Sequence, residues 1–330
     1  MLEYSERTMK ILVTGGAGFI GSNFVNDLVS SHDEWNEIIV IDALTYAGNL
    51  SNLENAVLDK RVKFVKGDIR DLELVNSHMP KVDTVVHFAA ESHVDRSIIN
   101  PHDFVSTNVL GTSILLKSAT DHNVKRFIHV STDEVYGSID AGSWTETSPI
   151  SPNSPYSASK ASSDLMALSY WKTYGLPVVV SRCSNNFGQN QFPEKLIPLA
   201  ITNLIDGLPI PIYGNGLNSR DWLHVSDHCS ALNNIIQKGI PGEIYNIGGG
   251  TEMSNIQTAK LILDLMNMDE SLIKFVEDRR GHDFRYSVDF TKINQSCGYV
   301  PIKKFDESLA ETINWYKTND SWWRKIKSNK

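Results

Sequence analysis

The stretch that decides the fold reads Lys10-Ile11-Leu12-Val13-Thr14-Gly15-Gly16-Ala17-Gly18-Phe19-Ile20-Gly21. A short apolar strand is predicted over residues 10–14, and a helix is predicted from about residue 22 to 30. The glycines fit both G-x-x-G-x-x-G and G-x-G-x-x-G, which combine a tight turn, close backbone approach to a pyrophosphate and close packing of helix on strand. The helix N-terminus offers free N–H groups and a positive dipole end to phosphates. The stretch predicts a dinucleotide site, with a plain glycine-rich connector as the alternative.

Further strands follow at intervals typical of an alternating α/β chain. They are predicted over residues 37–41, 62–69, 82–90, 126–130 and 178–182. Strands alternating with helices indicate a parallel, doubly wound sheet of the Rossmann type. We therefore expect this domain over residues 10–182, with returning segments at about 221–247 that rejoin the sheet near 222–225 and 244–247. A smaller α/β lobe is expected from residues 183–220 and 248–330, and residues 1–9 are expected to be a disordered extension.

Three strand ends carry residues that suit a dinucleotide. Asp42 lies 21 residues after Gly21, where an acid binds the ribose hydroxyls of NAD and repels the extra phosphate of NADP. Asp68 is expected near the adenine, and the small Ala89 and Ala90 let a cofactor pass close to the fourth strand. A helix cap at Asp42 and ordinary small-residue packing at the two alanines are the alternatives.

Composition limits the classes of function. The chain has 330 residues, of which 41% are hydrophobic, a formal net charge of -8 and three widely spaced cysteines. The acidic balance disfavours nucleic acid as the main partner. An odd number of scattered cysteines indicates reduced thiols in the cytoplasm and argues against a cysteine metal site. Because no run approaches about 18 apolar residues, no membrane span is expected.

The clearest chemical signal lies between a strand over residues 126–130 and Gly137. There Thr132-Asp133-Glu134 places a hydroxyl beside two adjacent acids at the end of a buried strand. Adjacent buried acids are costly unless they are solvated or used. They are therefore candidate catalytic groups, with a solvated turn or a helix cap as the alternative.

Tyr156 and Lys160 are separated by four residues and so share one helix face. A nearby ammonium favours phenolate, and we expect Lys160 to lower the pKa of Tyr156 so that the phenol can accept an alcohol proton during hydride transfer. Thr132 lies 24 residues upstream as a hydroxyl partner. In isolation the pair also fits a solvated helix face.

These motifs together resemble the extended short-chain dehydrogenase/reductase family. Within it they are most similar to nucleoside-diphosphate-glucose 4,6-dehydratases, in particular those acting on dTDP-glucose, and the resemblance covers nearly the whole chain from residue 10. It rests on residues 14–21, 42–49, 87–97, 131–137 and 156–160. The triplet Thr132-Asp133-Glu134 discriminates best, because 4-epimerases of this family lack the acid pair and GDP-mannose dehydratases typically carry Ser before the Glu.

The resemblance implies a reaction cycle. Tyr156 takes the C4 hydroxyl proton while NAD takes the C4 hydride, and the resulting ketone acidifies the C5 proton. Glu134 then removes that proton while neutral Asp133 protonates the departing C6 hydroxyl. The hydride finally returns to C6. Two neighbouring carboxyls can divide the work because their repulsion favours one protonated and one ionised form.

The resemblance also implies two sets of binding residues and no metal. Those expected to bind NAD are Gly15, Gly18, Phe19, Ile20, Gly21, Asp42, Leu44, Thr45, Asp68, Ile69, Ala89, Ala90, Thr107, Tyr156, Lys160 and Asn186. Those expected to bind the nucleotide sugar are Ser92, Thr132, Asn185, Lys195, Leu196, Pro211, Tyr213, Arg220, Asn255, Arg279, His282 and Tyr286. Asx turns at residues 185–186, edge packing at 209–214 and a solvated charged turn at 278–280 are the alternatives. Gln189 and Arg280 stand where relatives often have proline.

A homodimer through helices near residues 103–120 and 157–173 is implied by the resemblance, as is a role in deoxysugar biosynthesis such as that of dTDP-rhamnose. The alternatives are a UDP-sugar 4,6-dehydratase, a 4-epimerase, or a non-catalytic sensor of NAD or nucleotide sugar. The intact set Asp133, Glu134, Tyr156 and Lys160 speaks against a sensor, since a sensor does not need all four.

Overall fold

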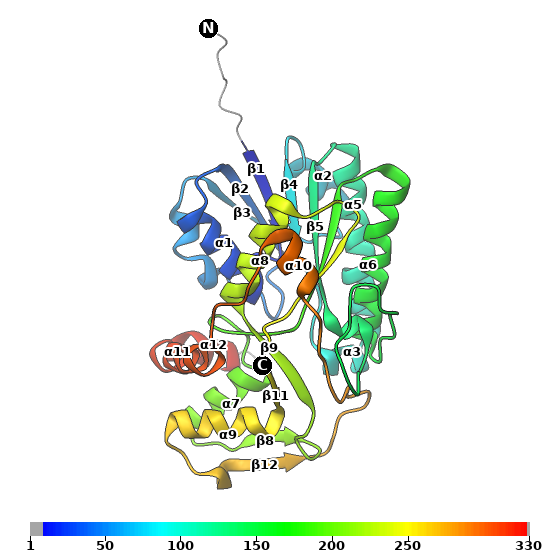
Figure 1. Ribbon diagram of the computed structural model, residues 1–330. Helices are drawn as coiled ribbons and strands as arrows, with labels where there is room; N and C mark the ends of the chain where they lie inside the picture. The colour runs from blue at the N-terminus through cyan, green and yellow to red at the C-terminus, as the bar shows by residue number, and fades with distance from the viewer. Residues whose placement is uncertain (1–8, 329–330) are drawn as a thin grey trace.

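A seven-stranded parallel sheet forms the larger lobe, in the order β10-β6-β5-β4-β1-β2-β3 (Figure 1). The computed structural model describes residues 9–328. The disordered extension predicted for residues 1–9 therefore lies outside the described residues, except for Met9, which begins the first strand. The strands are β1 (Met9–Thr14), β2 (Trp35–Asp42), β3 (Val62–Lys66), β4 (Thr84–His87), β5 (Arg126–Thr132), β6 (Val178–Cys183) and β10 (Ile244–Ile247).

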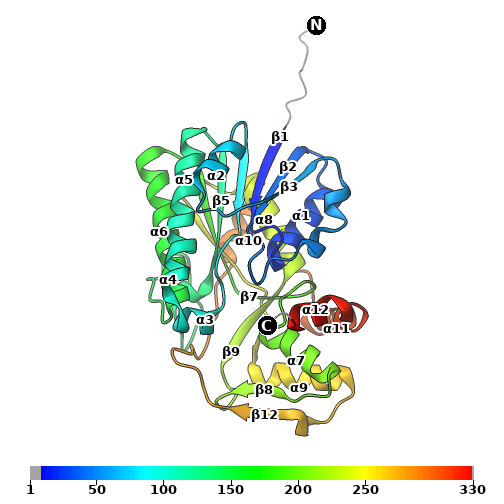
Figure 2. The ribbon, with the colours of Figure 1, turned by 180° about the vertical axis from the view of Figure 1, so that it is seen from behind.

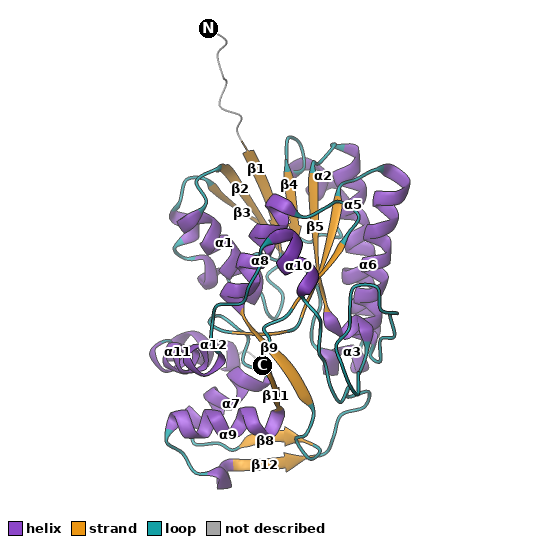
Figure 3. Cartoon of the chain, viewed as in Figure 1, coloured by secondary structure: helices purple, strands orange, loops and turns teal. Residues whose placement is uncertain are grey.

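Helices cover both faces of this sheet, which Figure 3 shows as strands enclosed by helices on either side. Successive residues of β1 point to opposite faces, so Ile11 and Val13 join one core and Leu12 joins the other. Near-continuous apolar strands are what a sheet buried on both faces requires. The first core is covered by α1 (Phe19–Ser31), α8 (Val225–Lys238) and α10 (Thr291–Cys297), and the second by α2 (Leu72–His78), α5 (Thr112–Asp121) and α6 (Pro155–Tyr174). The predicted doubly wound α/β class is confirmed.

A smaller lobe lies below the carboxyl ends of these strands (Figures 1 and 2). One sheet has the order β11-β9-β7 and a second pairs β12 with β8. Its core includes Phe187, Ile201, Ile262, Leu309 and Trp323. The elements are β7 (Asn185–Phe187), α7 (Leu196–Ile205), β8 (Ile210–Tyr213), β9 (Ser219–His224), β11 (Glu252–Ser254), α9 (Asn255–Met266), β12 (Ile273–Val276), α11 (Phe305–Thr318) and α12 (Asp320–Ser328).

Short helical segments connect the larger elements. Between β4 and α5 the chain forms α3 (Val94–Ile99), α4 (Pro101–Phe104) and a π-helix, η3 (Val105–Gly111). The 3₁₀ segments are η1 (Leu50–Leu53), η2 (Ala56–Leu58), η4 (Asp133–Tyr136) and η5 (Glu270–Leu272). Segment η4 places the two adjacent acids directly after β5.

The chain returns to the large sheet later than expected. We predicted a return near residues 222–225, but β9 pairs with β11 and β7 in the small lobe. The reason is that Asp221, just before Trp222, accepts bonds from the backbone N–H groups of Gly249 and Thr251, which ties β9 to the β11 side. Helix α8 packs on the large sheet, and β10 joins it beside β6, as predicted for residues 244–247. The domain boundaries themselves stay a prediction.

Candidate active site

One cavity of about 490 Å³ lies between the two lobes, at the carboxyl ends of the parallel strands. This is where open α/β sheets bind their ligands. Among the described residues, every predicted catalytic, cofactor and substrate residue lines this cavity except Leu44. Residues separated by more than 250 positions are thus brought to one site.

The glycine-rich loop joins β1 to α1 and forms one wall. Gly15 has φ +71°, and a Cβ there would lie 2.5 Å from the backbone nitrogen of Ala89 at the end of β4. A side chain at Gly18 would meet a single neighbour, the Gly15 carbonyl oxygen at 3.2 Å, and would otherwise fill space at the cavity wall. Gly18 is also the N-cap of α1. A cradle of backbone at a helix N-terminus fits the pyrophosphate of NAD.

Asp42 and Leu44 hold the next turn of this wall. The Asp42 carboxylate accepts bonds from Ala17 N (2.9 Å) and Leu44 N (2.8 Å). Leu44 adopts φ +52°, and its side chain packs against the core instead of lining the cavity. Its place in the site is therefore through its backbone. Burial raises the pKa of Asp42, and the backbone N–H groups oppose that rise.

Asp68 carries a partner that the sequence alone did not indicate. Arg70 donates from Nε to Asp68 Oδ1 at 2.9 Å and from a terminal nitrogen to Oδ2 at 2.5 Å. This hydrogen-bonded ion pair holds the pKa of Asp68 below its usual range. Both residues line the cavity, so the wall near the expected adenine position is a paired acid and base rather than an isolated carboxylate.

The acid pair has two different surroundings. Asp133 is 2% exposed, and its Oδ2 atom has no hydrogen-bond partner among the described residues. Burial raises the pKa of Asp133 well above its ordinary value, and the charges of Glu134 and Asp221 add to the rise. Glu134 is only half-buried and accepts a 3.4 Å bond from the Ser157 hydroxyl. The geometry therefore favours a neutral Asp133 beside a more solvated Glu134.

Thr132 shapes this turn from the end of β5. Its hydroxyl donates to Asp133 Oδ1 at 3.3 Å and accepts from the Glu134 backbone nitrogen at 3.2 Å. The second bond makes Thr132 the N-cap of η4. A capping residue that also touches the acid fixes where both carboxyl groups point.

Tyr156 and Lys160 lie in the first two turns of α6, and both line the cavity. Contrary to our expectation, the pKa of Tyr156 lies well above its ordinary value, because burial and the negative charge of Glu134 both raise it. A hydrogen bond with the Thr132 hydroxyl opposes that rise. The Lys160 ammonium donates to the Val130 carbonyl oxygen at 2.8 Å, and burial lowers its own pKa. The expected lowering of the Tyr156 pKa by Lys160 is thus not seen in the protein alone.

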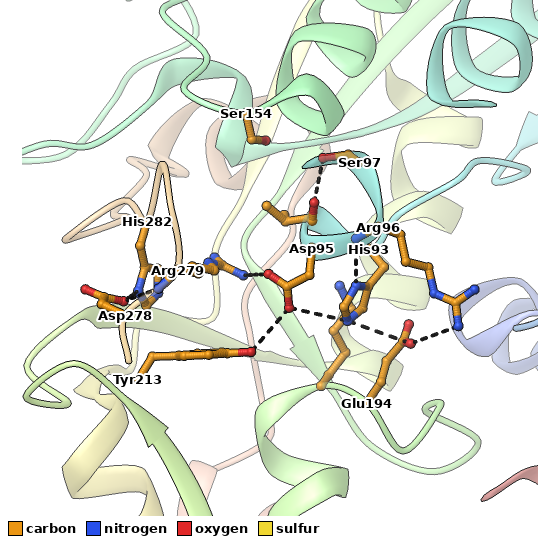
Figure 4. Close-up of polar contacts among 12 residues, drawn as sticks. His93, Asp95, Arg96, Ser97, Ser154, Glu194, Tyr213, Asp278, Arg279 and His282 are labelled. Atoms are coloured by element: carbon orange, nitrogen blue, oxygen red, sulfur yellow. Dashed lines mark hydrogen bonds and ion pairs between the residues drawn. The ribbon is translucent and has the colours of Figure 1, made fainter. Parts of the chain in front are cut away.

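The opposite wall of the cavity carries a group of charged side chains from both lobes (Figure 4). Asp95 in α3 lies between Arg279, 3.9 Å away, and the Tyr213 hydroxyl, which donates to it at 3.4 Å. The buried Nε of Arg279 has no hydrogen-bond partner within residues 9–328. His282 is held by Asp278 at 2.7 Å. An under-bonded guanidinium with a neighbouring imidazole suits a diphosphate.

A second group in Figure 4 surrounds Glu194. Its carboxylate lies 3.7 Å from His93 and 3.7 Å from Arg96. The next residue, Lys195, donates to the Ser92 carbonyl oxygen at 3.0 Å. We did not predict His93, Asp95 or Glu194 as site residues. Their place follows from contacts of the 93–96 segment with Glu194, Tyr213 and Arg279, which no local sequence pattern reveals.

Arg220 is more deeply buried than a phosphate ligand need be. It is 5% exposed and donates to the carbonyl oxygens of Ser219 and Asp283 at 2.7 and 2.9 Å. Its guanidinium carbon lies 4.4 Å from the centre of the Tyr286 ring. Arg220 therefore fixes the 283–286 segment that brings Tyr286 to the cavity.

The two asparagines after β6 differ in how far their side chains are engaged. Asn186 donates to Ser184 O at 2.9 Å and contacts His228 Nδ1 at 2.9 Å. The buried Oδ1 of Asn185 has no hydrogen-bond partner in the described part of the chain. An unpaired buried acceptor at a cavity wall fits a ligand hydroxyl.

Further features of the described residues concern metal binding, membrane-spanning helices and cysteines. Among residues 9–328, no group of three or more His, Cys, Asp or Glu side chains is placed to hold a metal ion. The helices described are each too short or too polar to cross a bilayer. Cys183, Cys229 and Cys297 are all buried and free.

Comparison with known proteins gives consistent relatives. Residues 12–312 match the family model described as GDP-mannose 4,6 dehydratase. The dTDP-glucose 4,6-dehydratase of an Actinoplanes species is 54% identical over 319 residues, which covers 96% of this chain and all of the relative. That of Streptomyces antibioticus is also 54% identical, covering 97% of this chain and 96% of the relative. The solved structure of DesIV, a dTDP-glucose 4,6-dehydratase from Streptomyces venezuelae with NAD bound, has a TM-score of 0.95 at 53% identity, covering 96% of this chain and 100% of the other.

Proposed function

The chain belongs to the dTDP-glucose 4,6-dehydratases, which are NAD-dependent hydro-lyases, and from this premise we propose how its own residues divide the chemistry. The reaction converts dTDP-glucose to dTDP-4-keto-6-deoxy-glucose and water. The observation that carries the proposal is the unequal burial of two adjacent acids, Asp133 and Glu134. An acid and a base side by side are what elimination of water requires.

Asp133 acts as the acid in this proposal. Burial and the charge of Glu134 raise its pKa well above the ordinary value, which favours the protonated carboxyl that can give its proton to the departing C6 hydroxyl. Glu134 acts as the base that removes the C5 proton. Within residues 9–328, its carboxylate accepts one long bond, from the Ser157 hydroxyl, which must break before it can do so.

Tyr156 accepts the C4 hydroxyl proton, with Thr132 and Lys160 beside it. When bound, NAD would supply the hydride acceptor and a positive charge. In the protein alone burial and Glu134 raise the Tyr156 pKa, and a positive charge from the cofactor would oppose that rise. Lys160, which donates to the Val130 carbonyl oxygen of β5, would hold the nicotinamide ribose.

For the cofactor, we assign the pyrophosphate to the glycine-rich loop and the N-terminus of α1, and the adenosine ribose to Asp42. The predicted set is completed by the alanines after β4 and by Thr45, Asp68, Ile69, Thr107 and Asn186. Leu44 contributes only its backbone. For the nucleotide sugar, Arg279 and His282 bind the diphosphate, and Asn185 meets a sugar hydroxyl. The remaining predicted contacts are Ser92, Lys195, Leu196, Pro211, Tyr213, Arg220, Asn255 and Tyr286.

Product analysis tests the function. Purified protein with NAD should convert dTDP-glucose to a product lighter by one water, with a 4-keto group. A product of unchanged mass with inverted C4 would favour the 4-epimerase alternative, and tight binding without any product would favour a sensor. A parallel assay with UDP-glucose decides the nucleotide, and we expect dTDP-glucose to be turned over with the higher kcat/KM.

We further propose a homodimer, on the evidence of an exposed apolar surface. Val105, Leu110 and Leu165 are 54–58% exposed on η3 and α6, and Tyr174 at the end of α6 is 60% exposed. Helix η3 lies within one of the two segments predicted to associate, 103–120, and α6 overlaps the other, 157–173. Exposed apolar side chains on neighbouring helices typically mark an interface. We also propose a cytoplasmic enzyme of deoxysugar biosynthesis, of which the dTDP-rhamnose pathway is one instance, because the three cysteines are free.

A further inference from the structure

The carboxy-terminal helix α12 lies at the junction of the two lobes, beneath α1 in both views of the molecule (Figures 1 and 2). Its two adjacent tryptophans point to different partners. Trp323 is completely buried in the small-lobe core, and its indole nitrogen donates to the Tyr316 carbonyl oxygen at 2.9 Å. Trp322 packs edge-on against Trp315, with 5.0 Å between ring centres. The indole N–H of Trp322 points out of the small lobe.

That indole N–H reaches the cofactor-binding lobe. Trp322 Nε1 donates to the side-chain oxygen of Asn52 in η1 at 2.8 Å, across 270 residues of sequence. Asn52 is 6% exposed, and its amide nitrogen donates in turn to the Ala17 carbonyl oxygen at 2.9 Å. The amide orientation is fixed by its partners, because an indole N–H requires the oxygen and a carbonyl requires the nitrogen.

Ala17 lies in the glycine-rich loop, one residue before the N-cap of α1. Its peptide groups are held from three sides: Asn52 and the Asn49 backbone nitrogen donate to its oxygen, and its nitrogen donates to Asp42 at 2.9 Å. The position of this residue therefore sets where the first turn of α1 begins. Gly18, Phe19 and Ile20 line the cavity region assigned to the pyrophosphate, and the Gly18 N–H is itself bound to the Gly15 carbonyl oxygen at 3.2 Å.

A second contact joins the same structures by an independent route. Gln189, which follows β7, donates from its amide nitrogen to Asn23 Oδ1 at 3.0 Å. The Asn23 amide nitrogen donates back to the Gln189 carbonyl oxygen at 3.1 Å and to Phe19 O, within α1, at 2.9 Å. A residue without a side-chain amide at position 189 could not make the bond to Asn23 Oδ1. Two hydrogen-bonded contacts thus tie the carboxy-terminal half to the loop and first helix.

We propose that α12 is a strap that retains NAD, with Trp322 as a positioning residue that acts on the glycine-rich loop through Asn52 and Ala17. The proposal rests on the proposed function, in which the hydride removed from C4 must return to C6 of the same substrate. If the cofactor left between these steps, the sugar would remain oxidised at C4 and the reaction would stop there. A fixed loop keeps its N–H groups in place for the pyrophosphate and so slows that loss.

The test compares two substitutions on one helix, Trp322→Phe and Trp323→Phe. Each removes one indole N–H and keeps an aromatic ring, but only the first breaks the contact between lobes. The measurements are the dissociation constant and dissociation rate of NAD by calorimetry and rapid dilution, and thermal unfolding of the protein without cofactor. A neutral hydrogen bond is worth about 1 kcal/mol, or roughly fivefold in affinity.

We expect Trp322→Phe to weaken NAD binding by roughly fivefold, mostly through faster release, and added NAD to restore its turnover of dTDP-glucose. Trp323→Phe should lower the unfolding temperature more and leave the NAD dissociation constant within about twofold. An unchanged NAD constant in Trp322→Phe would overturn the proposal. Equal weakening by both variants would also overturn it, because docking of the helix and not the Trp322 bond would then be responsible. If the unaltered protein fails to bind NAD, the cofactor assignment itself fails, which is a distinct result.

Discussion

Asp133 illustrates how one residue can be costly to the fold and useful to the chemistry. It is buried beside a second acid, with one carboxyl oxygen lacking a partner among the described residues. Stability is often sacrificed at sites that must hold such groups. The adjacent acids could be recognised in the sequence as costly at a strand end. The surroundings of Asp133 could not, since they include the charges of Asp221 and Arg220 from the small lobe.

Asp133→Asn should stabilise the folded protein at neutral pH. The unfolded chain ionises this acid above about pH 3.9, whereas its raised pKa in the folded protein opposes ionisation. The contribution of Asp133 to stability therefore falls as pH rises above the unfolded pKa, and an amide removes that dependence. Denaturant midpoints should be higher for the variant at about pH 7 and equal at about pH 3.

Asp68→Asn serves as a control of opposite sign. The pKa of Asp68 is lowered by Arg70, so its ion pair contributes stability above the unfolded pKa that is lost as pH falls through the folded one. The asparagine variant should be slightly less stable near neutral pH. A lower midpoint for Asp133→Asn at neutral pH would contradict the assignment of a protonated Asp133.

At the scale of elements, the strands and the glycine-rich turn were predictable because each is encoded locally. Apolar runs of β-branched residues and a fixed glycine spacing depend on few distant contacts. The β9 segment was assigned to the wrong sheet because its partners, β11 and β7, are distant in sequence. The group around Asp95 and Glu194 escaped prediction for the same reason. Leu44, which was expected to bind NAD, has a left-handed backbone, and its side chain packs against the core and does not line the cavity.

Gly15→Ala should be more damaging than a glycine substitution with the same backbone conformation elsewhere. Gly15 and Gly175 have φ of +71° and +73°, but a Cβ at Gly15 would lie 2.5 Å from Ala89 N, and one at Gly175 would meet nothing within 4 Å. Gly175→Ala should cost about 1 kcal/mol of unfolding free energy from backbone strain alone. Gly15→Ala should cost roughly 1–3 kcal/mol more and weaken NAD binding. Equal losses in denaturant titrations would show that β4 does not crowd the turn.

At the scale of the whole molecule, two lobes share one cavity, and polar contacts across the junction help to fix their relative position. Asp95 with Arg279, and Trp322 with Asn52, are among them. The long-range pairing of tail and loop could not be predicted, although the paired tryptophans were visible as an unusual tail. The larger surface feature is the apolar face of η3 and α6, which we assign to a second copy of the chain.

Leu165→Glu should convert the proposed dimer to a monomer, because a charge would be buried at an apolar contact. Light scattering should give half the particle mass of the unaltered protein. Ile302→Glu is the control, since Ile302 is 80% exposed away from these helices and its substitution should leave the mass unchanged. A monomer before any substitution, or a dimer that Leu165→Glu leaves intact, would refute this interface.

The division of labour between Asp133 and Glu134 is tested most directly by Glu134→Gln in deuterated water. Glu146→Gln, outside the cavity, is the matched control. With NAD and dTDP-glucose, we predict that the Glu134 variant forms a 4-keto sugar that keeps its C6 hydroxyl, takes up no deuterium at C5, and loses water about 10²–10⁴ times more slowly. Mass spectrometry of quenched samples distinguishes these species. Water loss at the natural rate, with deuterium at C5, would contradict the assignment of Glu134 as the base.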